Sequence, residues 1–353
     1  MNDNLNEMGQ SSIVENDIEL IVKSIKQFSD KMENKKFLIV GGKGFIGTYF
    51  VKVLSRINKS LKKPMKITVI DNLITAKDKD PYQDPNITFL EKDISKEIQY
   101  TDDLDYIIHA ASIASPPYYR KHPLETIDVN YQGTRNLLEL SKEKKVSGIL
   151  FLSSSEIYGD PDIIPTPESY QGNVSCTGPR ACYDESKRLA ETVSILYEQI
   201  FKIPVKIARL FNVYGPFLNL DDGRMIPDFM KSAIKESKII IHSDGSVTRS
   251  FCYITDVISA LFKILMVAPP GSICNVGNDK EEISVKNAAE LIKKIVKTPV
   301  EIKYEKSDDP NYVVNNPQRR CPDLSHIRKI INYEPQINFE EGLRRIYLWY
   351  TGN

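Results

Sequence analysis

A glycine-rich turn, GGKGFIG, joins a short apolar run to a helix-like segment near the start of the chain. Residues 37–40 have the length and composition of a buried strand, and residues 45–54 carry apolar side chains at helical spacing. Gly41, Gly44 and Gly47 follow the spacing GxxGxxG. Glycines in a strand–turn–helix unit let the backbone approach a pyrophosphate, whose charge the helix N-terminus attracts. The unit therefore predicts a dinucleotide site on a parallel sheet.

Strand-like and helix-like segments alternate along much of the chain. Short apolar runs typical of buried strands lie at 65–71, 87–93, 104–112 and 146–155. Helical patterns separate several of them, most clearly at 123–145. Apolar strands alternating with helices predict a parallel sheet covered on both faces, so the expected fold class is α/β, a Rossmann-type doubly wound sheet. After residues 205–216 the pattern becomes irregular, which indicates a smaller, interleaved C-terminal lobe that binds substrate.

Length and charge exclude several classes of protein. The 353 residues suffice for one large domain or two smaller ones, and 47 Lys and Arg balance 47 Asp and Glu. Because no strongly basic surface is expected, nucleic acid is not a predicted partner. No apolar run approaches the length of a membrane span, and the N-terminal sequence MNDNLNEMGQ is unlike a signal peptide. We therefore expect no membrane association.

The cysteines and histidines show no ligand pattern. The four histidines are dispersed, and the cysteines lack CxxC spacing. The cysteines are Cys176, Cys182, Cys252, Cys274 and Cys321. An odd, unpatterned set of cysteines predicts reduced thiols and a cytoplasmic location, with neither a disulfide framework nor a metal site.

Tyr183 and Lys187 lie in a YxxxK spacing within the polar run GPRACYDESKR. Residues four apart share one face of a helix, about one turn from each other. A lysine ammonium beside a phenol favours the phenolate and lowers the phenol pKa below its usual value of about 10. Tyr183 would then serve as a base near neutral pH. An ordinary solvated helix carrying one aromatic residue is the alternative explanation of YxxxK alone.

Two aspartates follow strand-like runs near the predicted dinucleotide site. Asp71 ends the second run, where a carboxylate can accept hydrogen bonds from an adenosine ribose and repel a 2′-phosphate. We therefore predict NAD rather than NADP, although a strand-end aspartate can also simply cap a turn. Asp93 ends the third run and is assigned to the adenine side. Phe45 and Ile46, directly after the glycine turn, complete the predicted cofactor site.

GxxGxxG followed by YxxxK resembles the extended short-chain dehydrogenases/reductases, the NAD-dependent epimerase/dehydratase family. The resemblance spans roughly residues 36–348, and the chain is most similar to the UDP-glucuronate decarboxylases, the UDP-xylose synthase group. The similar stretches are ASPP at 114–117, SSSEIYGDP at 153–161, GNV at 172–174, GPRACYDESKR at 178–188, RLFNVYGP at 209–216, DDGR at 221–224, DGSVTRSFCYITD at 244–256 and PQRRCPD at 317–323.

The resemblance implies a sugar nucleotide whose C4 hydroxyl is oxidised by NAD. Tyr183 would take the hydroxyl proton, while Lys187 keeps the phenol acidic and holds the nicotinamide ribose. Ser154 matches the hydroxyl that hydrogen-bonds the reacting oxygen. Ser155 and Glu156 would lie near C5, where Glu156 orients the sugar or manages the proton that returns to C5.

Four further residues match substrate contacts of the family. Arg320 aligns with the arginine that meets the sugar's carboxylate in decarboxylases, although a surface arginine would look the same in sequence. Arg249 and Arg224 match contacts to the nucleotide phosphate and the nucleotide sugar, and a guanidinium suits bidentate phosphate binding. Asn212 matches a contact to the diphosphate.

Several functions remain open at this stage. If C5 bears a carboxylate, the C4 ketone makes it a β-keto acid, and loss of carbon dioxide gives UDP-xylose or its 4-keto form; this lyase reaction is the favoured one. If C5 bears CH2OH, loss of water would make the protein a nucleotide-sugar 4,6-dehydratase, but dehydratases usually carry an aspartate in place of Ser155. A 4-epimerase is a further alternative. A non-catalytic NAD-binding sensor is disfavoured because Ser154, Tyr183 and Lys187 are all present.

The domain organisation follows from the same patterns. Residues 1–35 form an N-terminal extension, polar and disordered to about residue 12 and then an amphipathic helix. Residues 36–210, with roughly 247–275, form the NAD-binding Rossmann domain. Residues 211–246 and 276–353 form the sugar-nucleotide-binding lobe.

The resemblance also implies a homodimer. In this superfamily, helices corresponding to residues 123–145 and 184–200 form a four-helix bundle across a two-fold axis. Residues 184–200 place Leu189, Val193, Leu196 and Tyr197 on one stripe, which is more apolar surface than one domain face requires.

Overall fold

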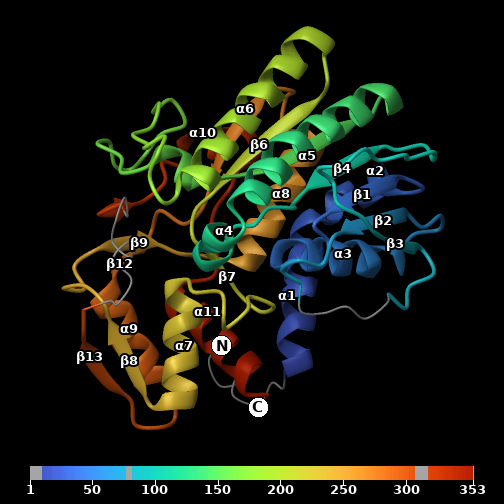
Figure 1. Ribbon diagram of the computed structural model, residues 1–353. Helices are drawn as coiled ribbons and strands as arrows, with labels where there is room; N and C mark the ends of the chain where they lie inside the picture. Colours follow the sequence, from blue (N-terminus) through green and yellow to red (C-terminus); the bar gives the residue numbers. More distant parts are fainter. Residues whose placement is uncertain (1–9, 77–81, 307–316, 353) are drawn as a thin grey trace.

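The computed structural model describes residues 10–76, 82–306 and 317–352 (Figure 1). Its main element is a parallel seven-stranded sheet in the order β11-β6-β5-β4-β1-β2-β3. The strands are β1 (Lys36–Val40), β2 (Lys66–Asp71), β3 (Ile87–Glu91), β4 (Tyr106–His109), β5 (Gly148–Ser154), β6 (Val205–Leu210) and β11 (Ser272–Val276). The strand order reverses between β1 and β4, as in doubly wound sheets. The predicted fold class is confirmed.

Helices cover both faces of the sheet (Figure 1). Successive strand residues point to opposite faces, so Phe37 and Ile39 pack into one apolar core and Leu38 and Val40 into another. The helices on the first face are α3 (Phe45–Asn58) and α8 (Ile254–Val267), and those on the second are α5 (Pro123–Lys144) and α6 (Ala181–Phe201). Short helices α4 (Pro116–Lys121) and η3 (Ser155–Tyr158) follow β4 and β5. Burial on both faces explains why the strands are almost wholly apolar.

A smaller second lobe lies beyond the carboxyl edge of the sheet (Figure 1). Its elements are α7 (Met225–Glu236), β8 (Lys238–Ile241), β9 (Thr248–Ser250), β12 (Glu282–Ser284), α9 (Val285–Ile295), β13 (Glu301–Tyr304), β14 (Arg319–Arg320) and α11 (Phe339–Thr351). The short helix α10 (Ser325–Ile331) instead packs on α8 and β11 of the main body. The strands of the lobe form the small sheets β12-β9-β14 and β13-β8, and a third pairs β7 (Val213–Tyr214) with β10 (Cys252–Tyr253). Because α8 and β11 return to the main sheet between these elements, the two parts interleave.

The N-terminal extension packs against the main body. It consists of α1 (Gln10–Ile25), η2 (Lys26–Phe28) and α2 (Ser29–Met32). Ile18, Ile21 and Ile25 of α1 are buried in the core shared with α3 and α8, so α1 packs by one apolar face. The predicted disorder falls mostly on residues 1–9, which lie outside the described residues, whereas residues 10–12 belong to α1.

A buried aspartate fixes this extension in place. Asp17 of α1 accepts hydrogen bonds from the hydroxyls of Tyr49 and Tyr253, each at 2.9 Å, and pairs with Arg345 Nη1 at 2.8 Å. One carboxylate thereby links α1 to α3, β10 and α11. Among the described residues, no helix combines the length and the apolar character needed to cross a bilayer.

Candidate active site

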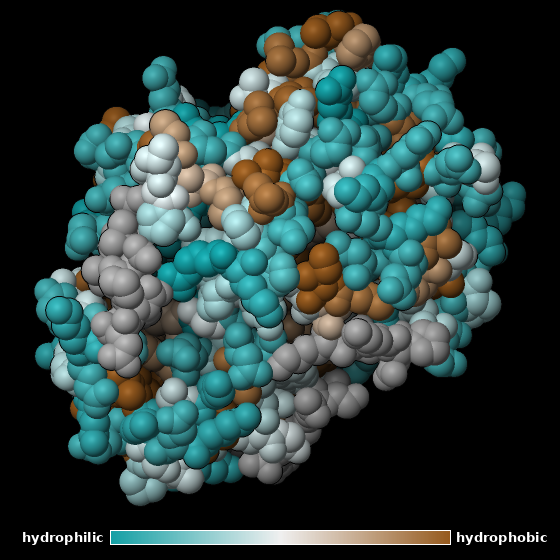
Figure 2. All heavy atoms as spheres, in the orientation of Figure 1, coloured by the Kyte–Doolittle hydropathy of each residue, from teal (hydrophilic) through white to brown (hydrophobic). Residues whose placement is uncertain are grey.

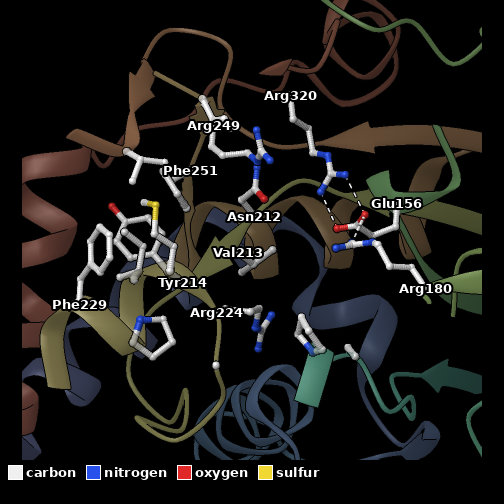
Figure 3. Close-up of a pocket in the computed structure, with 18 of the residues that line it drawn as sticks. Glu156, Arg180, Asn212, Val213, Tyr214, Arg224, Phe229, Arg249, Phe251 and Arg320 are labelled. Atoms are coloured by element: carbon white, nitrogen blue, oxygen red, sulfur yellow. Dashed lines mark hydrogen bonds and ion pairs between the residues drawn. The ribbon is translucent and has the colours of Figure 1, made fainter. Parts of the chain in front are cut away.

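Two cavities lie at the carboxyl edge of the main sheet, where doubly wound folds bind ligands. The central cavity, about 270 Å³, is bounded by residues from η3, α6, α7, β9 and β14 (Figure 3). The glycine-turn cavity, about 130 Å³, is lined in part by Gly41, Gly44, Asp71 and Asp93. Most of the candidate site residues line one of these two cavities.

The glycine turn has the geometry of a pyrophosphate cradle. Gly41 has a φ of +81°, and a Cβ there would lie 2.5 Å from the backbone nitrogen of Ala111. A Cβ on Gly47 would lie 2.1 Å from Gly41 O, so both positions require glycine. Gly44 faces the cavity and begins α3 without a side-chain cap, which leaves amide groups of the first turn, including Phe45 and Ile46, available to an anion. This cradle fits the diphosphate of a dinucleotide.

Asp71 lines the glycine-turn cavity and also supports the turn. Its Oδ2 accepts from the Lys43 backbone N–H and its Oδ1 from the Leu73 N–H, both at 2.9 Å. Burial raises the pKa of Asp71, and these backbone hydrogen bonds oppose the rise. Asp93 lies two residues beyond β3, lines the same cavity and accepts from the N–H and hydroxyl of Ser95. Both aspartates thus line the cavity and also accept hydrogen bonds within their own turns. For Asp71, the predicted cofactor position and the alternative of turn capping therefore occur together.

Replacing Asp71 with alanine should reduce the preference for NAD over NADP by about tenfold, because a charged acceptor near the ribose is lost together with its repulsion of a 2′-phosphate. Asp71→Asn keeps an oxygen that accepts from the Leu73 N–H but removes the charge. It therefore distinguishes the effect of the charge on cofactor choice from the effect of losing support for the turn. Calorimetric dissociation constants of both cofactors for the three proteins provide the measurement. Equal affinity for NAD and NADP in the unmodified protein would show that Asp71 only caps the turn.

Tyr183, Lys187 and Ser154 come together at the start of α6 and the end of β5. The Tyr183 hydroxyl is hydrogen-bonded to the Ser154 side chain, and Lys187 Nζ donates to Leu152 O at 2.8 Å. Lys187 Nζ lies 5.9 Å from the centre of the Tyr183 ring. The end of β5 and the first two turns of α6 therefore hold three of the five predicted catalytic groups as one unit.

The pKa values of this unit correct the prediction of an acidic phenol. Burial raises the pKa of Tyr183 to about 12, and the hydrogen bond from Ser154 only partly opposes it. Burial also lowers the pKa of Lys187 to about 7, so near neutral pH much of this lysine is uncharged. The expected lowering of the phenol pKa by Lys187 is therefore wrong for this structure, because desolvation of both side chains outweighs their proximity.

Glu156 is held between two arginines on one side of the central cavity (Figure 3). Arg320 binds it with two nitrogens, Nη2 lying 2.8 Å from Oε2, and Arg180 forms a second ion pair. Burial alone would raise the pKa of Glu156, but Arg180 and Arg320 hold it well below its ordinary range. Glu156 is thus ionised while both arginines bind it. Ser155, assigned to the same region, is buried in η3, and the described cavity lining includes Glu156 but not Ser155.

The other predicted substrate residues also line the central cavity. Asn212 donates from Nδ2 to Ser250 O at 2.9 Å, and Arg224 forms an ion pair with Asp222. Burial lowers the pKa of Arg249 to about 9, and the positive charge of Arg320 adds to this effect. All four substrate residues named from the sequence thus reach one cavity.

The cavity is polar and positive at one side and aromatic at the other. Its described lining carries five arginines and a single carboxylate, Glu156. Tyr214, Phe229 and Phe251 lie on the opposite side from Glu156 (Figure 3). Such a cavity suits an anionic ligand with a planar ring at one end. Among the described residues, no cluster of His, Cys, Asp or Glu could hold a metal ion.

Arg180 was missed by the sequence analysis. It lies three residues before Tyr183, at the N-cap of α6, and pairs with both Glu156 and Asp184. Its position one turn from Tyr183, within the run GPRACYDESKR, was the available signal.

Comparison with known proteins agrees with this geometry. Residues 37–277 match the NAD dependent epimerase/dehydratase family. The chain is 36% identical to UDP-glucuronic acid decarboxylase 3 of Arabidopsis thaliana over 88% of this chain and 87% of that protein. It is 35% identical to UDP-glucuronic acid decarboxylase 1 of Xenopus tropicalis, over 90% of this chain and 73% of that protein.

Two solved structures extend the comparison. The NAD dependent-NDP-hexosamine 5,6-dehydratase TunA, of tunicamycin biosynthesis, is 28% identical, with a TM-score of 0.75 over 90% of this chain and 98% of that chain. The UDP-N-acetylglucosamine 4-epimerase of Methanobrevibacter ruminantium M1 is 24% identical, with a TM-score of 0.78 over 91% of this chain and 99% of that chain. The second likeness concerns the fold alone.

Proposed function

Since the chain belongs to the NAD-dependent epimerase/dehydratase family, we propose that it is an NAD-dependent decarboxylase of UDP-glucuronate that forms UDP-xylose or its 4-keto precursor. The observation that carries the proposal is the pair of arginines, Arg180 and Arg320, that already binds a carboxylate beside Tyr183 in the central cavity. Two guanidinium groups at that place favour a sugar that carries a carboxylate at C5 over a neutral hexose.

The first step removes a proton from the C4 hydroxyl. Tyr183 is the base, and Ser154, hydrogen-bonded to it, holds the same oxygen. NAD, when bound, would accept the hydride that leaves C4. Lys187, when charged, favours the phenolate of Tyr183.

The second step breaks the bond between C5 and the carboxyl group. With C4 as a ketone, the electron pair of that bond passes to C5 and is delocalised onto the ketone oxygen as carbon dioxide leaves. Arg320 orients the carboxylate so that the breaking bond stands perpendicular to the ketone plane. C5 then takes up a proton, and C4 is reduced where UDP-xylose is the product.

Dehydration of a neutral hexose is the second candidate, as for 4,6-dehydratases. It requires an acid to protonate the leaving hydroxyl, but a neutral hexose brings no carboxylate that could take Arg320 from Glu156, so Arg180 and Arg320 keep Glu156 ionised. This observation favours decarboxylation. A 4-epimerase would need no group of this kind, and a sensor would not need Ser154, Tyr183 and Lys187 together.

Incubation with UDP-glucuronate, UDP-glucose and UDP-N-acetylglucosamine, followed by mass spectrometry and carbon dioxide detection, tests the proposal. We expect carbon dioxide and a UDP-pentose from UDP-glucuronate alone. Loss of water from a neutral hexose nucleotide would instead identify a dehydratase, and the absence of any product would favour a sensor.

We also propose a cytoplasmic homodimer joined through α5 and α6. Leu189, Leu196 and Ile200 are exposed along one stripe of α6, and Figure 2 shows apolar residues gathered near the end of this helix at the top of the molecule. Leu124 of α5 is also exposed. Tyr197, expected on the same stripe, is instead buried between the two helices.

The unmodified protein should have twice its chain mass of 40.2 kDa in solution. Ile200→Asp, which places a charge at the C-terminal end of the stripe, should produce monomers at micromolar concentration. Val267→Asp is the control because Val267 is an exposed apolar residue on α8, at the other face of the sheet. Light scattering after size exclusion measures all three masses, and a monomeric unmodified protein would contradict the proposed dimer.

A further inference from the structure

A third cavity lies on the other side of Arg180 from the central cavity. This rear cavity, about 400 Å³, is lined by residues 159–160 and 173–175 and by Arg180 and Asp184 at the start of α6. Arg180 also lines the central cavity, so its guanidinium separates the two spaces. A polar cavity of this size holds water molecules.

Asp184 is the unusual group at this boundary. It is only 5% exposed, and its Oδ1 has no hydrogen-bond partner within the described parts of the chain. Its Oδ2 lies 3.7 Å from Arg180 Nε. On its other side, Arg180 pairs with Glu156 in the central cavity (Figure 3). One guanidinium therefore joins two carboxyl groups, one facing each cavity.

The proposed reaction needs a proton from solvent. Conversion of UDP-glucuronate to UDP-xylose replaces the C5 carboxylate with hydrogen and releases carbon dioxide, so each turnover consumes one proton. The hydride and the hydroxyl proton taken from C4 are both returned in the last step and do not supply it. A bound sugar nucleotide occupies the central cavity, so the proton needs another route.

We propose that Asp184 and the rear cavity form a proton inlet, through which the proton that C5 acquires is replenished from solvent. The inference rests on the proposed function. Water in the rear cavity protonates Asp184. When the substrate carboxylate takes Arg320 from Glu156, Glu156 loses one of the two charges that hold it ionised, and the proton of Asp184 then passes to Glu156, which faces C5. This transfer moves a negative charge from Glu156 to Asp184, which lie on either side of Arg180. The Arg180 guanidinium then pairs with Asp184 in place of Glu156, and the total charge of the three side chains is unchanged.

The surroundings of Asp184 suit this role. Burial raises the pKa of Asp184 to about 7, and the negative charges of Glu156 and Glu185 add to the rise, while Arg180 and Arg320 oppose it. Asp184 therefore carries a proton below about pH 7 and loses it as the pH rises through that value. The kcat of the unmodified protein should decline above about pH 7 as this donor ionises.

Asp184→Asn tests the inlet, because asparagine keeps the volume but cannot exchange a proton. Its kcat for UDP-xylose formation should fall by about tenfold, and the decline above pH 7 should disappear. The dissociation constant of UDP-glucuronate should stay unchanged. Glu185→Gln, at the half-exposed neighbouring position, is the matched control: it removes one of the negative charges that raise the pKa of Asp184, so it should keep kcat at low pH and move the decline to slightly lower pH.

Asp184→Ala provides a readout that a structural role would not produce. This variant leaves space beside the rear cavity, so added formate should restore much of the lost kcat, whereas Asp184→Asn should gain nothing. A normal kcat and pH profile in Asp184→Asn, with an active unmodified protein, would overturn the inlet alone. Failure of the unmodified protein to release carbon dioxide from UDP-glucuronate would overturn the proposed function and the inlet with it.

Discussion

Tyr183→Phe should lower kcat for UDP-glucuronate by about 10³-fold while the dissociation constant of the sugar nucleotide stays within about twofold of its original value. The substitution removes only the hydroxyl that takes the C4 proton. The ring is buried and stacked on Tyr119, with the centres 5.5 Å apart and the planes 16° apart, so the packing of α6 is preserved. Coupled assays of product and calorimetric binding give the two quantities.

Tyr304→Phe is the matched control, because Tyr304 is exposed on β13 in the second lobe and lies outside both cavities. It should retain full activity. Retention of activity within about tenfold by Tyr183→Phe would contradict the assignment of Tyr183 as the base. In that case Ser154 or another group would have to take the proton, and the resemblance of YxxxK would be misleading.

Most of the fold could be predicted because its signals are local. The glycine turn lies between β1 and α3 in both the sequence pattern and the structure, and the strand-like runs coincide with β2 to β5. Periodicity identified α5 and the helix of the N-terminal extension, since one face of each packs on apolar neighbours. Parallel pairing follows from the helical crossovers between the strands.

Contacts between distant segments could not be predicted in the same way. Glu156 and Arg320 are 164 positions apart, and nothing in either stretch indicates that they bind each other. The chain also gave no sign that Asp17 joins Tyr49, Tyr253 and Arg345 in one buried cluster. Such pairs are created by the tertiary fold, which brings β14 of the second lobe against η3 at the end of β5.

The pKa values depend on burial, which spacing does not reveal. YxxxK places Tyr183 and Lys187 one turn apart, as predicted, but the direction of the phenol shift depends on how much water reaches the pair. In this fold both side chains are buried, so the pKa of Tyr183 rises and the pKa of Lys187 falls. Each shift favours the neutral form of the side chain. The proximity of Tyr183 and Lys187 could therefore be predicted from the sequence, whereas the directions of their pKa shifts could not.

Arg320→Ala should weaken UDP-glucuronate binding by about 100-fold, because it removes a buried guanidinium from the carboxylate of the substrate. Binding of UDP-glucose, which lacks that carboxylate, should change by no more than about threefold. Arg319→Ala is the control, since Arg319 is exposed and paired with Glu282. Equal losses for the two sugar nucleotides would contradict the proposed contact between Arg320 and the sugar carboxylate.

Glu156→Gln separates substrate recognition from a purely structural ion pair. In the structure Glu156 occupies the guanidinium of Arg320 that the substrate carboxylate requires, so the two carboxylates compete. Removing the charge of Glu156 should therefore tighten UDP-glucuronate binding by about tenfold, while kcat falls because the group that passes a proton to C5 is gone. If the pair served only to hold β14 against η3, both Arg320→Ala and Glu156→Gln would weaken binding. Arg320→Ala should weaken UDP-glucuronate binding and Glu156→Gln should tighten it, and these opposite changes are expected only where a substrate carboxylate takes the place of Glu156. Weaker binding by Glu156→Gln would exclude that competition.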